Sequence, residues 1–334
     1  MNKIAELIKP SVDLNQLALK AKKLTKQHFG NTIQLYIPLY LSNECCNSCK
    51  YCGFNKDQNI VRQTLSLKEA VVQLKLIKEK GFDNILLLTG EHKSRAGVDY
   101  LAPIINEAQK MFSYVSLEIF PGSEDDYKKL IEAGATGLTL YQETYNRDIY
   151  KEMHPAGPKS DFDFRLTAPE NGLKAGMRKI GLGALIGLND WREEAIALGA
   201  HLENLMKTYW RADFSVSFPR ISAAPDGLTI YPISDKDFVQ LILAFRVAFP
   251  KVGIILSTRE NAELRDNLLG LGVTQISAES KTNPGGYSDT EADEQFEVHD
   301  NRSLEDILSV LEAKGFDPVI KDWSPVFNKV KKIL

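Results

Sequence analysis

Cysteine is absent from almost the whole of this 334-residue chain. The four cysteines are Cys45, Cys46, Cys49 and Cys52, and no other position carries one. A disulfide framework would spread its cysteines through the fold in order to join distant segments, so this distribution excludes one. Thiols gathered on one short loop, just after an apolar segment, predict a metal site instead.

Long hydrophobic runs are also missing. The longest, such as Ile85–Leu88 and Leu182–Leu188, are far too short to cross a bilayer, and Met1–Glu6 lacks the apolar core of a signal peptide. The net charge is only −3 and the lysines are spread along the chain, so nothing indicates a nucleic acid as partner. We therefore expect a cytoplasmic protein with no membrane and no nucleic-acid partner, and unpaired thiols fit a reducing cytoplasm.

The spacing Cys45-x3-Cys49-x2-Cys52 indicates an iron–sulfur cluster. Three thiolates so spaced can each hold one corner of a [4Fe–4S] cube and leave the fourth iron free to bind and activate a small molecule. The alternative is a structural zinc site, which requires four ligands around one ion, and the neighbours Cys45 and Cys46 would hardly reach the same metal. The five histidines show no HxxxH-type spacing. Cys46 is then the spare thiol.

Short apolar segments rich in β-branched residues alternate with amphipathic stretches, and this alternation predicts an α/β fold. Ser66 and Glu69 form a capping-box pattern that begins one helix, and Gly81 ends it. Eight strands, each followed by a helix, predict a closed (β/α)8 TIM-type barrel; an open barrel of six strands is the alternative. The expected strands span residues 33–40, 84–89, 114–120, 137–141, 180–185, 214–218, 253–257 and 274–277. Further helices are expected at residues 193–207, 235–249 and 262–271.

We divide the chain into three parts. Residues 1–30 are expected to form an N-terminal helical extension, residues 31–300 the barrel, and residues 301–334 a helix and short strand that extend the same domain. Active sites of such barrels lie at the C-terminal ends of the strands. Polar residues stand at several of these ends, and one alone could be a turn former, but together they predict a site: Gly90-Glu91, Glu118, Gln142-Glu143, Arg220, Arg259 and Ser277.

The cysteine segment resembles the signature of the radical S-adenosylmethionine (SAM) superfamily, with an aromatic residue, Tyr51, before the third cysteine. Further motifs resemble the aromatic amino acid lyases of that superfamily, and the C-terminal ones resemble most the tyrosine lyases of thiazole biosynthesis. These motifs are Leu88–Glu91, Tyr141–Tyr145, Gly181–Leu188, Ser215–Arg220, Ser257–Glu260, Ser277–Tyr287, Glu294–Glu297 and Lys321–Trp323. Cys46 is a departure, since the family pattern does not require cysteine there.

The resemblance implies a radical SAM barrel that binds a [4Fe–4S] cluster through Cys45, Cys49 and Cys52, with SAM on the open iron. It also implies cleavage of the Cα–Cβ bond of L-tyrosine. A 5′-deoxyadenosyl radical takes a hydrogen atom from the amino nitrogen, and the products are 2-iminoacetate and p-cresol. Thiazole synthase is the implied partner, and flavodoxin or ferredoxin the implied reductant.

The resemblance also implies roles for residues that would bind SAM. Glu91 matches a glutamate that accepts from the SAM ammonium group, although it could simply be an acid at a helix N-terminus. Arg165 matches the arginine for the SAM carboxylate, with a surface ion pair to Asp163 as the alternative. Glu118, Gln142 and Glu143 are candidates for the ribose hydroxyls and Tyr51 for the adenine, and Gly90, beside Glu91, is a further cofactor-binding candidate.

The resemblance also implies which residues would bind the substrate. Arg259 and Ser277 resemble the pair that holds the amino acid carboxylate, and Tyr40 matches a tyrosine near the substrate. Arg220 could assist, or could form a structural ion pair across the barrel mouth. Glu143 and His92 are candidates for the proton relay to the phenol.

Related enzymes define the alternatives. The tyrosine lyase that matures [FeFe]-hydrogenase carries a second cluster on additional cysteines, whereas no cysteine follows Cys52 here. Two other functions stay open: a radical SAM lyase acting on another aromatic amino acid such as tryptophan, and a non-catalytic scaffold with a structural zinc site.

Overall fold

Eight parallel strands close into a barrel in the computed structural model, which describes residues 3–221 and 228–321. Neighbouring strands follow the order β2-β3-β4-β5-β6-β7-β8-β1, and β1 also pairs with β2, so the sheet returns to its start. The predicted closed barrel is therefore confirmed, and the open six-stranded alternative is wrong. The strands are β1 (Thr32–Ser42), β2 (Asn84–Thr89), β3 (Tyr114–Glu118), β4 (Gly137–Glu143), β5 (Lys179–Ala184), β6 (Asp213–Ser217), β7 (Gly253–Leu256) and β8 (Gln275–Ser277).

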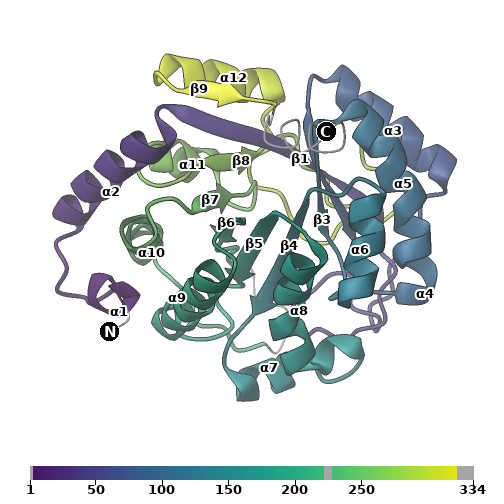
Figure 1. Ribbon diagram of the computed structural model, residues 1–334, viewed down its shortest axis with the longest axis horizontal. Helices are drawn as coiled ribbons and strands as arrows, with labels where there is room; N and C mark the ends of the chain where they lie inside the picture. Colours follow the sequence, from purple (N-terminus) through teal and green to yellow (C-terminus); the bar gives the residue numbers. More distant parts are fainter. Residues whose placement is uncertain (1–2, 222–227, 322–334) are drawn as a thin grey trace.

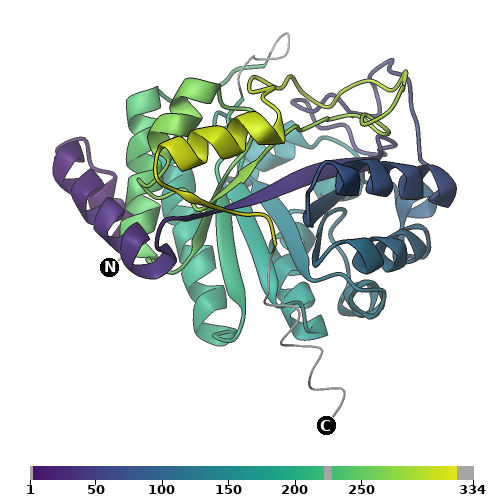
Figure 2. The same ribbon diagram turned by 90° about the horizontal axis from the view of Figure 1, so that it is seen from above.

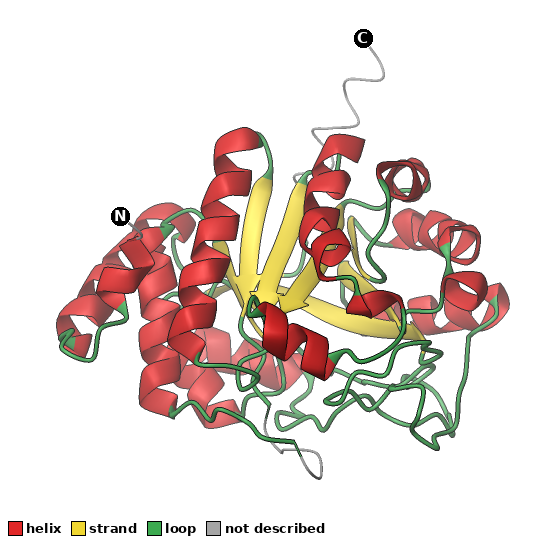
Figure 3. Cartoon of the chain, turned by 90° about the horizontal axis from the view of Figure 1, so that it is seen from below, coloured by secondary structure: helices red, strands yellow, loops and turns green. Residues whose placement is uncertain are grey.

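Helices surround the barrel, and long loops gather at one end of it (Figure 1, Figure 3). The helices are α1 (Lys3–Leu7), α2 (Leu14–Phe29), α3 (Leu67–Glu79), α4 (Lys93–Ala96), α5 (Val98–Met111), α6 (Glu124–Glu132), α7 (Arg147–Met153), η1 (Pro158–Ser160), α8 (Phe162–Ala175), α9 (Trp191–Thr208), α10 (Asp235–Ala248), α11 (Ala262–Leu268) and α12 (Leu304–Ala313). The capping box predicted at Ser66 is present, with the Glu69 carboxylate accepting from the Ser66 backbone N–H.

Both ends of the described chain pack on the barrel (Figure 2). Helix α2 lies against α10, where Leu17 and Ala21 form a small core with Leu243 and Val247. After α12, strand β9 (Asp317–Val319) runs parallel to the first residues of β1. Asp322 and Trp323 of the last predicted motif lie outside the described residues. No described helix combines the length and the apolar character needed to span a membrane.

The strands are buried because their outer faces meet the helices and their inner faces meet one another. In β2, for example, Ile85 and Leu87 are fully buried and belong to the main core. Parallel strands covered on both sides in this way require nearly continuous apolar sequence, which is why the strands could be predicted. Because every strand points the same way, all their C-terminal ends open at one mouth of the barrel.

Candidate active site

The cysteine loop leaves the C-terminal end of β1 and covers the barrel mouth. Cys45, Cys49 and Cys52 line a cavity of about 80 Å³ there, together with residues that follow β2, β3 and β4. Cys46 does not line this cavity. Its Sγ and its backbone N–H both donate to the carbonyl oxygen of Glu91, at 2.9 and 3.1 Å. Three thiols therefore face the cavity, and the fourth is tied to the backbone behind it.

The three thiols fit a cluster better than a single ion. A zinc site would bring its thiolates within about 4 Å of one another, because each Zn–S bond is about 2.3 Å. In the described part of the chain, no three His, Cys, Asp or Glu side chains converge closely enough to hold one metal ion. Burial raises the pKa of the Cys49 thiol to about 12 and also raises that of Cys52. These thiols need cations beside them to ionise, and the irons of a cluster supply that charge.

The loop is held in shape by the Arg62 side chain, which binds its backbone. The Arg62 guanidinium donates to the carbonyl oxygens of Asn43, Phe54 and Asn55 at 2.6–2.8 Å. Gly90, at the exit of β2, lies so close to the loop that a Cβ there would overlap the Glu44 carbonyl group. Glycine at this position therefore allows β2 to meet the cysteine loop.

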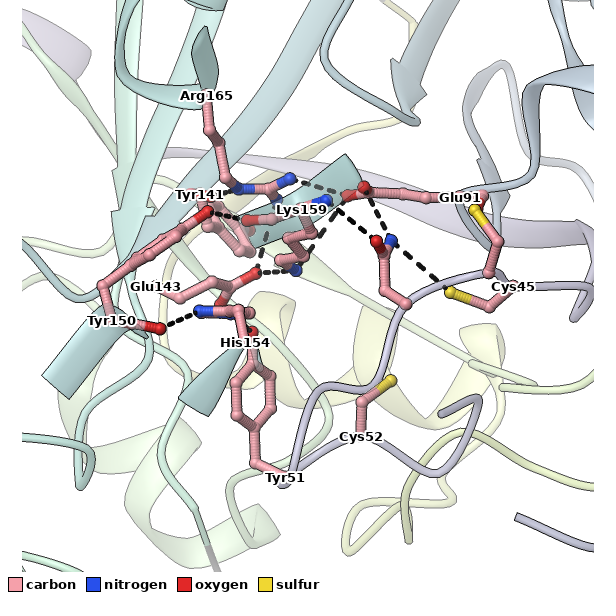
Figure 4. A network of polar contacts seen from close by, with 12 residues as sticks. Cys45, Tyr51, Cys52, Glu91, Tyr141, Glu143, Tyr150, His154, Lys159 and Arg165 are labelled. Carbon is pink, nitrogen blue, oxygen red and sulfur yellow. Dashed lines mark hydrogen bonds and ion pairs between the residues drawn. The ribbon is translucent and has the colours of Figure 1, made fainter. Parts of the chain in front are cut away.

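Two acids and two bases form a buried network beside the thiols (Figure 4). Arg165 contacts Glu91 at 2.6 Å and Glu143 at 3.4 Å, while Lys159 contacts Glu143 at 2.8 Å and Glu91 at 4.0 Å. Burial alone would raise the pKa of both carboxyl groups, but the two cations outweigh it and the pKa of each is lowered. All four groups are therefore charged at neutral pH, and the network is neutral as a whole.

Each member of the network comes from a different element. Arg165 lies in the first turn of α8, where its Nε donates to the Tyr141 carbonyl oxygen at 2.7 Å. The expected alternative, a surface pair of Arg165 with Asp163, is wrong, because Arg165 is buried and Asp163 pairs with Arg147. Glu91 does not cap a helix either. Its carboxylate binds Arg165 and accepts from the Asn47 side-chain amide at 3.0 Å.

Glu143 has a left-handed backbone with φ of 71°. It lies at an irregularity of β4, where the pairing with β5 shifts between Tyr141 and Glu143. Such a backbone costs about 1–3 kcal/mol in a residue other than glycine, and it persists only when its surroundings hold it. Here the contacts with Lys159 and Arg165 do so, and they direct the Glu143 carboxylate into the barrel mouth.

A second, larger cavity of about 380 Å³ adjoins the first. The Arg259 guanidinium lies in it, 3.4 Å from the centre of the Phe296 ring. Within residues 3–221 and 228–321 this guanidinium makes no hydrogen bond or ion pair, although Arg259 is half-buried. A half-buried guanidinium that lacks an anionic partner is suited to bind one. Ser277, at the end of β8, lines the same cavity.

Several residues line both cavities and so mark their junction: Tyr40, Cys52, Leu88, Glu118, Tyr141, Glu143, Lys159 and Gln295. Among them Glu118, at the end of β3, is unusual in its protonation. Burial raises the pKa of its carboxyl to about 7, and the charge of Glu143 adds to this rise. Glu118 therefore changes charge near neutral pH between the two cavities.

The structure does not bring every predicted residue to the site. Gln142 lines neither cavity, and its Nε2 donates to the Phe162 carbonyl oxygen at 3.3 Å. Arg220 pairs with Glu260 and Asp235, which is the structural ion pair given as its alternative. His92 also lies outside both cavities, with its ring against the Ser94 hydroxyl.

Tyr51 is held by a histidine that the sequence did not single out as a site residue. Burial lowers the pKa of His154 to about 3, so its imidazole is neutral. Its Nδ1 lies 2.7 Å from the Tyr150 carbonyl oxygen and must carry the hydrogen, so Nε2 accepts from the Tyr51 hydroxyl at 2.7 Å. This bond fixes the Tyr51 ring at the edge of the larger cavity.

Sequence reasoning also missed Asn47, Lys159 and Gln295. Each lines a cavity, but none stands at a strand end, where polar residues of a barrel active site are expected. The one signal near Lys159 was the segment Gly157-Pro158, since such a pair marks special backbone geometry. Gln295 lies on the loop after β8, and only the folded chain brings it to the cysteines.

The geometry described above, a closed parallel barrel with three thiols and a charged network at its mouth, is that of a radical SAM enzyme. Residues 39–199 match the Radical SAM superfamily, and residues 217–317 match the Biotin and Thiamin Synthesis associated domain. The 2-iminoacetate synthase of Escherichia coli (strain K12) is 42% identical, over 96% of this chain and 86% of that protein. The Salmonella typhimurium (strain LT2) protein of the same name is 43% identical, over 93% and 83%.

Solved structures agree with these relatives. HydG, a maturase of the [FeFe]-hydrogenase, has a TM-score of 0.92 at 33% identity, over 96% of this chain and 73% of that one. The HydG of Carboxydothermus hydrogenoformans has a TM-score of 0.89 at 37% identity, over 94% and 74%. The chain belongs to the 2-iminoacetate synthase family of radical SAM enzymes. As a radical SAM enzyme it uses a [4Fe–4S] cluster and SAM.

The buried network generates a prediction for Lys159→Met. This change leaves the Glu143 carboxylate buried and held only by the longer Arg165 contact. Removing one partner of a buried ion pair costs about 3–5 kcal/mol. We expect the free energy of unfolding at pH 8, measured by urea denaturation of the cluster-containing protein, to fall by about 3 kcal/mol.

The pH dependence of this loss has a defined sign. In the wild type, the lowered pKa of Glu143 contributes stability above its unfolded pKa, and that contribution is lost as the pH falls. In the variant the buried carboxyl takes up a proton more readily, so the deficit should be smaller at pH 5 than at pH 8. Lys56→Met, at an exposed position of the cysteine loop, is the control. An equal loss in both variants would contradict the prediction.

Proposed function

We propose that this enzyme is a carbon–carbon lyase that cleaves the Cα–Cβ bond of L-tyrosine to 2-iminoacetate and p-cresol. The observation that supports this most is the half-buried Arg259 guanidinium, which has no anionic partner among the described residues and lies in a 380 Å³ cavity that adjoins the three thiols. An amino acid carboxylate is the anion this receptor suits, and the cavity is large enough for a tyrosine side chain. Identity of 42–43% to two 2-iminoacetate synthases supports the same reaction.

The smaller cavity suits the cofactors. Cys45, Cys49 and Cys52 would hold the cluster, and Cys46 would remain a bystander. Arg165 would bind the SAM carboxylate and Glu91 its ammonium group. These two side chains now bind each other at 2.6 Å, and a zwitterion could insert between them with each charge meeting its opposite. When bound and reduced, the cluster and SAM together supply methionine and a 5′-deoxyadenosyl radical.

The remaining residues around this cofactor pair have narrower roles. Glu118 lies where the two cavities meet and is our candidate for the ribose hydroxyls. Tyr51, fixed by His154, would pack near the adenine. We assign no ligand contact to Gln142, whose side chain donates to the Phe162 carbonyl oxygen, or to Arg220, which pairs with Glu260 and Asp235.

In the larger cavity, Arg259 and Ser277 would hold the tyrosine carboxylate, with the amino nitrogen directed toward the smaller cavity. Tyr40 would lie beside the substrate at the junction. The amino nitrogen would lose a hydrogen atom to the 5′-deoxyadenosyl radical, which becomes 5′-deoxyadenosine, and the resulting nitrogen radical would break the Cα–Cβ bond. This releases 2-iminoacetate and a 4-hydroxybenzyl radical, which one electron and one proton convert to p-cresol. Glu143, with Lys159 bound to it, is our candidate for moving that proton.

The chemistry of the product indicates that another enzyme takes it over directly. An imine of glyoxylate hydrolyses readily in water, so direct transfer to the enzyme that consumes it is favoured. We propose thiazole synthase as that enzyme, flavodoxin or ferredoxin as the electron donor, and the reducing cytoplasm as the compartment. A lyase acting on another aromatic amino acid is the second candidate, since the cavity volume does not by itself select the phenol.

The test of the proposed function is an anaerobic assay of the reconstituted protein with SAM, dithionite and L-tyrosine. We expect p-cresol, glyoxylate (the hydrolysis product of 2-iminoacetate) and 5′-deoxyadenosine to form together. Deoxyadenosine without cresol would contradict tyrosine as substrate and lead to a comparison with tryptophan. Neither product, from protein with intact cluster, would contradict the enzyme assignment.

The carboxylate receptor is tested by Arg259→Met. We expect the KM for tyrosine to rise about 100-fold, because losing one member of a desolvated charge pair costs roughly 2–5 kcal/mol. At tyrosine concentrations well below the raised KM, deoxyadenosine should still form with little cresol, since SAM binding uses other residues. Arg211→Met, at an exposed position before β6, is the matched control and should leave the KM unchanged. A normal KM in the Arg259 variant would remove this arginine from the substrate site.

The cluster ligands are tested by comparing two neighbouring cysteines. Cys49→Ala should abolish the cluster and all product formation, because it removes a thiol that lines the cavity. Cys46→Ala should retain both, because that thiol donates to the Glu91 carbonyl oxygen instead. Iron and acid-labile sulfide content measure the outcome, and equal loss of cluster in the two variants would overturn the assignment.

Glu118 gives a prediction for pH. The SAM sulfonium is a cation, so binding it nearby should lower the Glu118 pKa from its value of about 7 in the free protein. Binding then releases a proton, and SAM affinity should rise as the pH increases from 6 to 8, by about tenfold for each unit by which the pKa falls. Equilibrium dialysis measures this. Glu118→Gln should flatten the profile, whereas the exposed Glu132→Gln should not.

A further inference from the structure

Gln295 makes two side-chain hydrogen bonds that join three separate parts of the chain. Its Oε1 accepts from the Tyr40 hydroxyl of β1 at 2.7 Å. Its Nε2 donates to Sγ of Cys52 in the cysteine loop at 3.5 Å, within the range for a sulfur acceptor. Gln295 itself lies on the loop that follows β8, and it lines both cavities. One side-chain amide thus connects a tyrosine at the cavity junction to a thiol of the cysteine loop.

The Tyr40 hydroxyl supports one orientation of this amide, in which the NH2 group faces the sulfur. A primary amide has an acceptor oxygen and a donor nitrogen at opposite ends, and either could in principle point to Cys52. Because the Tyr40 hydroxyl donates to the oxygen, the NH2 group is directed to Sγ. Tyr40 is itself buried and fixed by an edge-to-face contact with Phe54, with ring centres 5.8 Å apart.

The backbone of Gln295 is also fixed. Its N–H donates to the Thr282 carbonyl oxygen at 3.0 Å, and the Thr282 hydroxyl returns a bond to the Phe296 carbonyl oxygen at 2.9 Å. On the other side, Gly53 lies so close that a Cβ there would overlap the Gln295 carbonyl group. The loop after β8 is therefore packed directly on Cys52 and its neighbour, and the amide does not depend on a mobile side chain to reach the sulfur.

We propose that Gln295 is a positioning residue for the cluster: its side-chain N–H···S bond to Cys52 raises the reduction potential of the cluster. Tyr40 acts on this potential through its hydrogen bond with Gln295. Reduction adds negative charge that the ligand sulfurs share. A donor aimed at such a sulfur therefore stabilises the reduced form more than the oxidised form. The inference rests on the proposed assignment of Cys52 as a cluster ligand.

This role would link the two cavities. Tyr40 lies at their junction, so a substrate that displaced or strengthened the Tyr40–Gln295 bond would alter the donor at Cys52. The hydrogen bonds supply a physical route of two contacts for that effect. Neither residue needs to touch the open iron to exert it.

The experiment is an EPR-monitored redox titration of the reconstituted enzyme without substrate, on samples matched in iron and sulfide. Gln295→Glu keeps the shape and the acceptor for Tyr40 but replaces the donor, and Gln295→Leu removes both bonds without adding charge. At a fixed donor potential we expect the ratio of reduced to oxidised cluster to fall about tenfold in Gln295→Leu, a shift of about 59 mV for one electron. The ratio should fall further in Gln295→Glu, because this change adds a negative charge beside the cluster.

Tyr40→Phe tests the second half of the proposal. In the wild-type background this change should lower the ratio of reduced to oxidised cluster, because the Gln295 amide is no longer held by Tyr40. In the Gln295→Leu background it should leave that ratio unchanged. Gln58→Leu, an exposed glutamine of the same cysteine loop, is the matched control and should leave the potential unchanged.

Two results would overturn the proposal. One is an unchanged potential in both Gln295 variants. The other is an effect of Tyr40→Phe that persists in the Gln295→Leu background, which would mean that Tyr40 acts by another route. The titration uses no tyrosine and no product measurement, so a failure of the proposed lyase reaction would appear in the product assay and not here.

Discussion

The mutual neutralisation of four buried charges at the barrel mouth is the interaction on which this site depends. Glu91, Glu143, Lys159 and Arg165 come from four different parts of the chain, and each would be costly to bury alone. Paired, they hold the strained backbone of Glu143 and keep two opposite charges ready beside three thiols. A zwitterionic cofactor suits such a site, because it can exchange one internal ion pair for two new ones without leaving a charge unpaired.

Two adjoining cavities with different polar groups separate two tasks. The thiols and the ion-pair network line the smaller one, whereas the larger one contains the Arg259 guanidinium, which has no ion pair among the described residues. Glu118 and Tyr40 line both cavities, so a ligand in either cavity can contact these two side chains. The loop after β8 closes this arrangement, because its consecutive residues Gln295 and Phe296 contact Cys52 and Arg259 respectively. Enclosure of this kind suits radical chemistry, which must exclude water and stray hydrogen donors.

Local patterns predicted the barrel well. The strand at Asn84–Thr89 was predicted with its observed bounds, since a run of apolar residues between polar ones has few other uses. The prediction ended β4 at Tyr141, two residues early, because Glu143 continues the strand through a left-handed irregularity that depends on distant cations. Ser66 began α3 as its capping box indicated. The family resemblance carried by the cysteine spacing and strand-end motifs was confirmed by the relatives.

The sequence by itself determined the fold class, the cysteine spacing and the polar residues at the ends of consecutive strands, because these depend on local periodicity and on neighbours along the chain. Only the tertiary structure decided that Cys46 turns away to Glu91, that Arg220 is occupied by Glu260, and that Lys159 joins Glu143. It also decided that Gln295 reaches Cys52, 243 positions earlier. These contacts were hidden because the partner of a buried polar group is chosen by geometry and the exclusion of water, and neither is recorded in the order of residues.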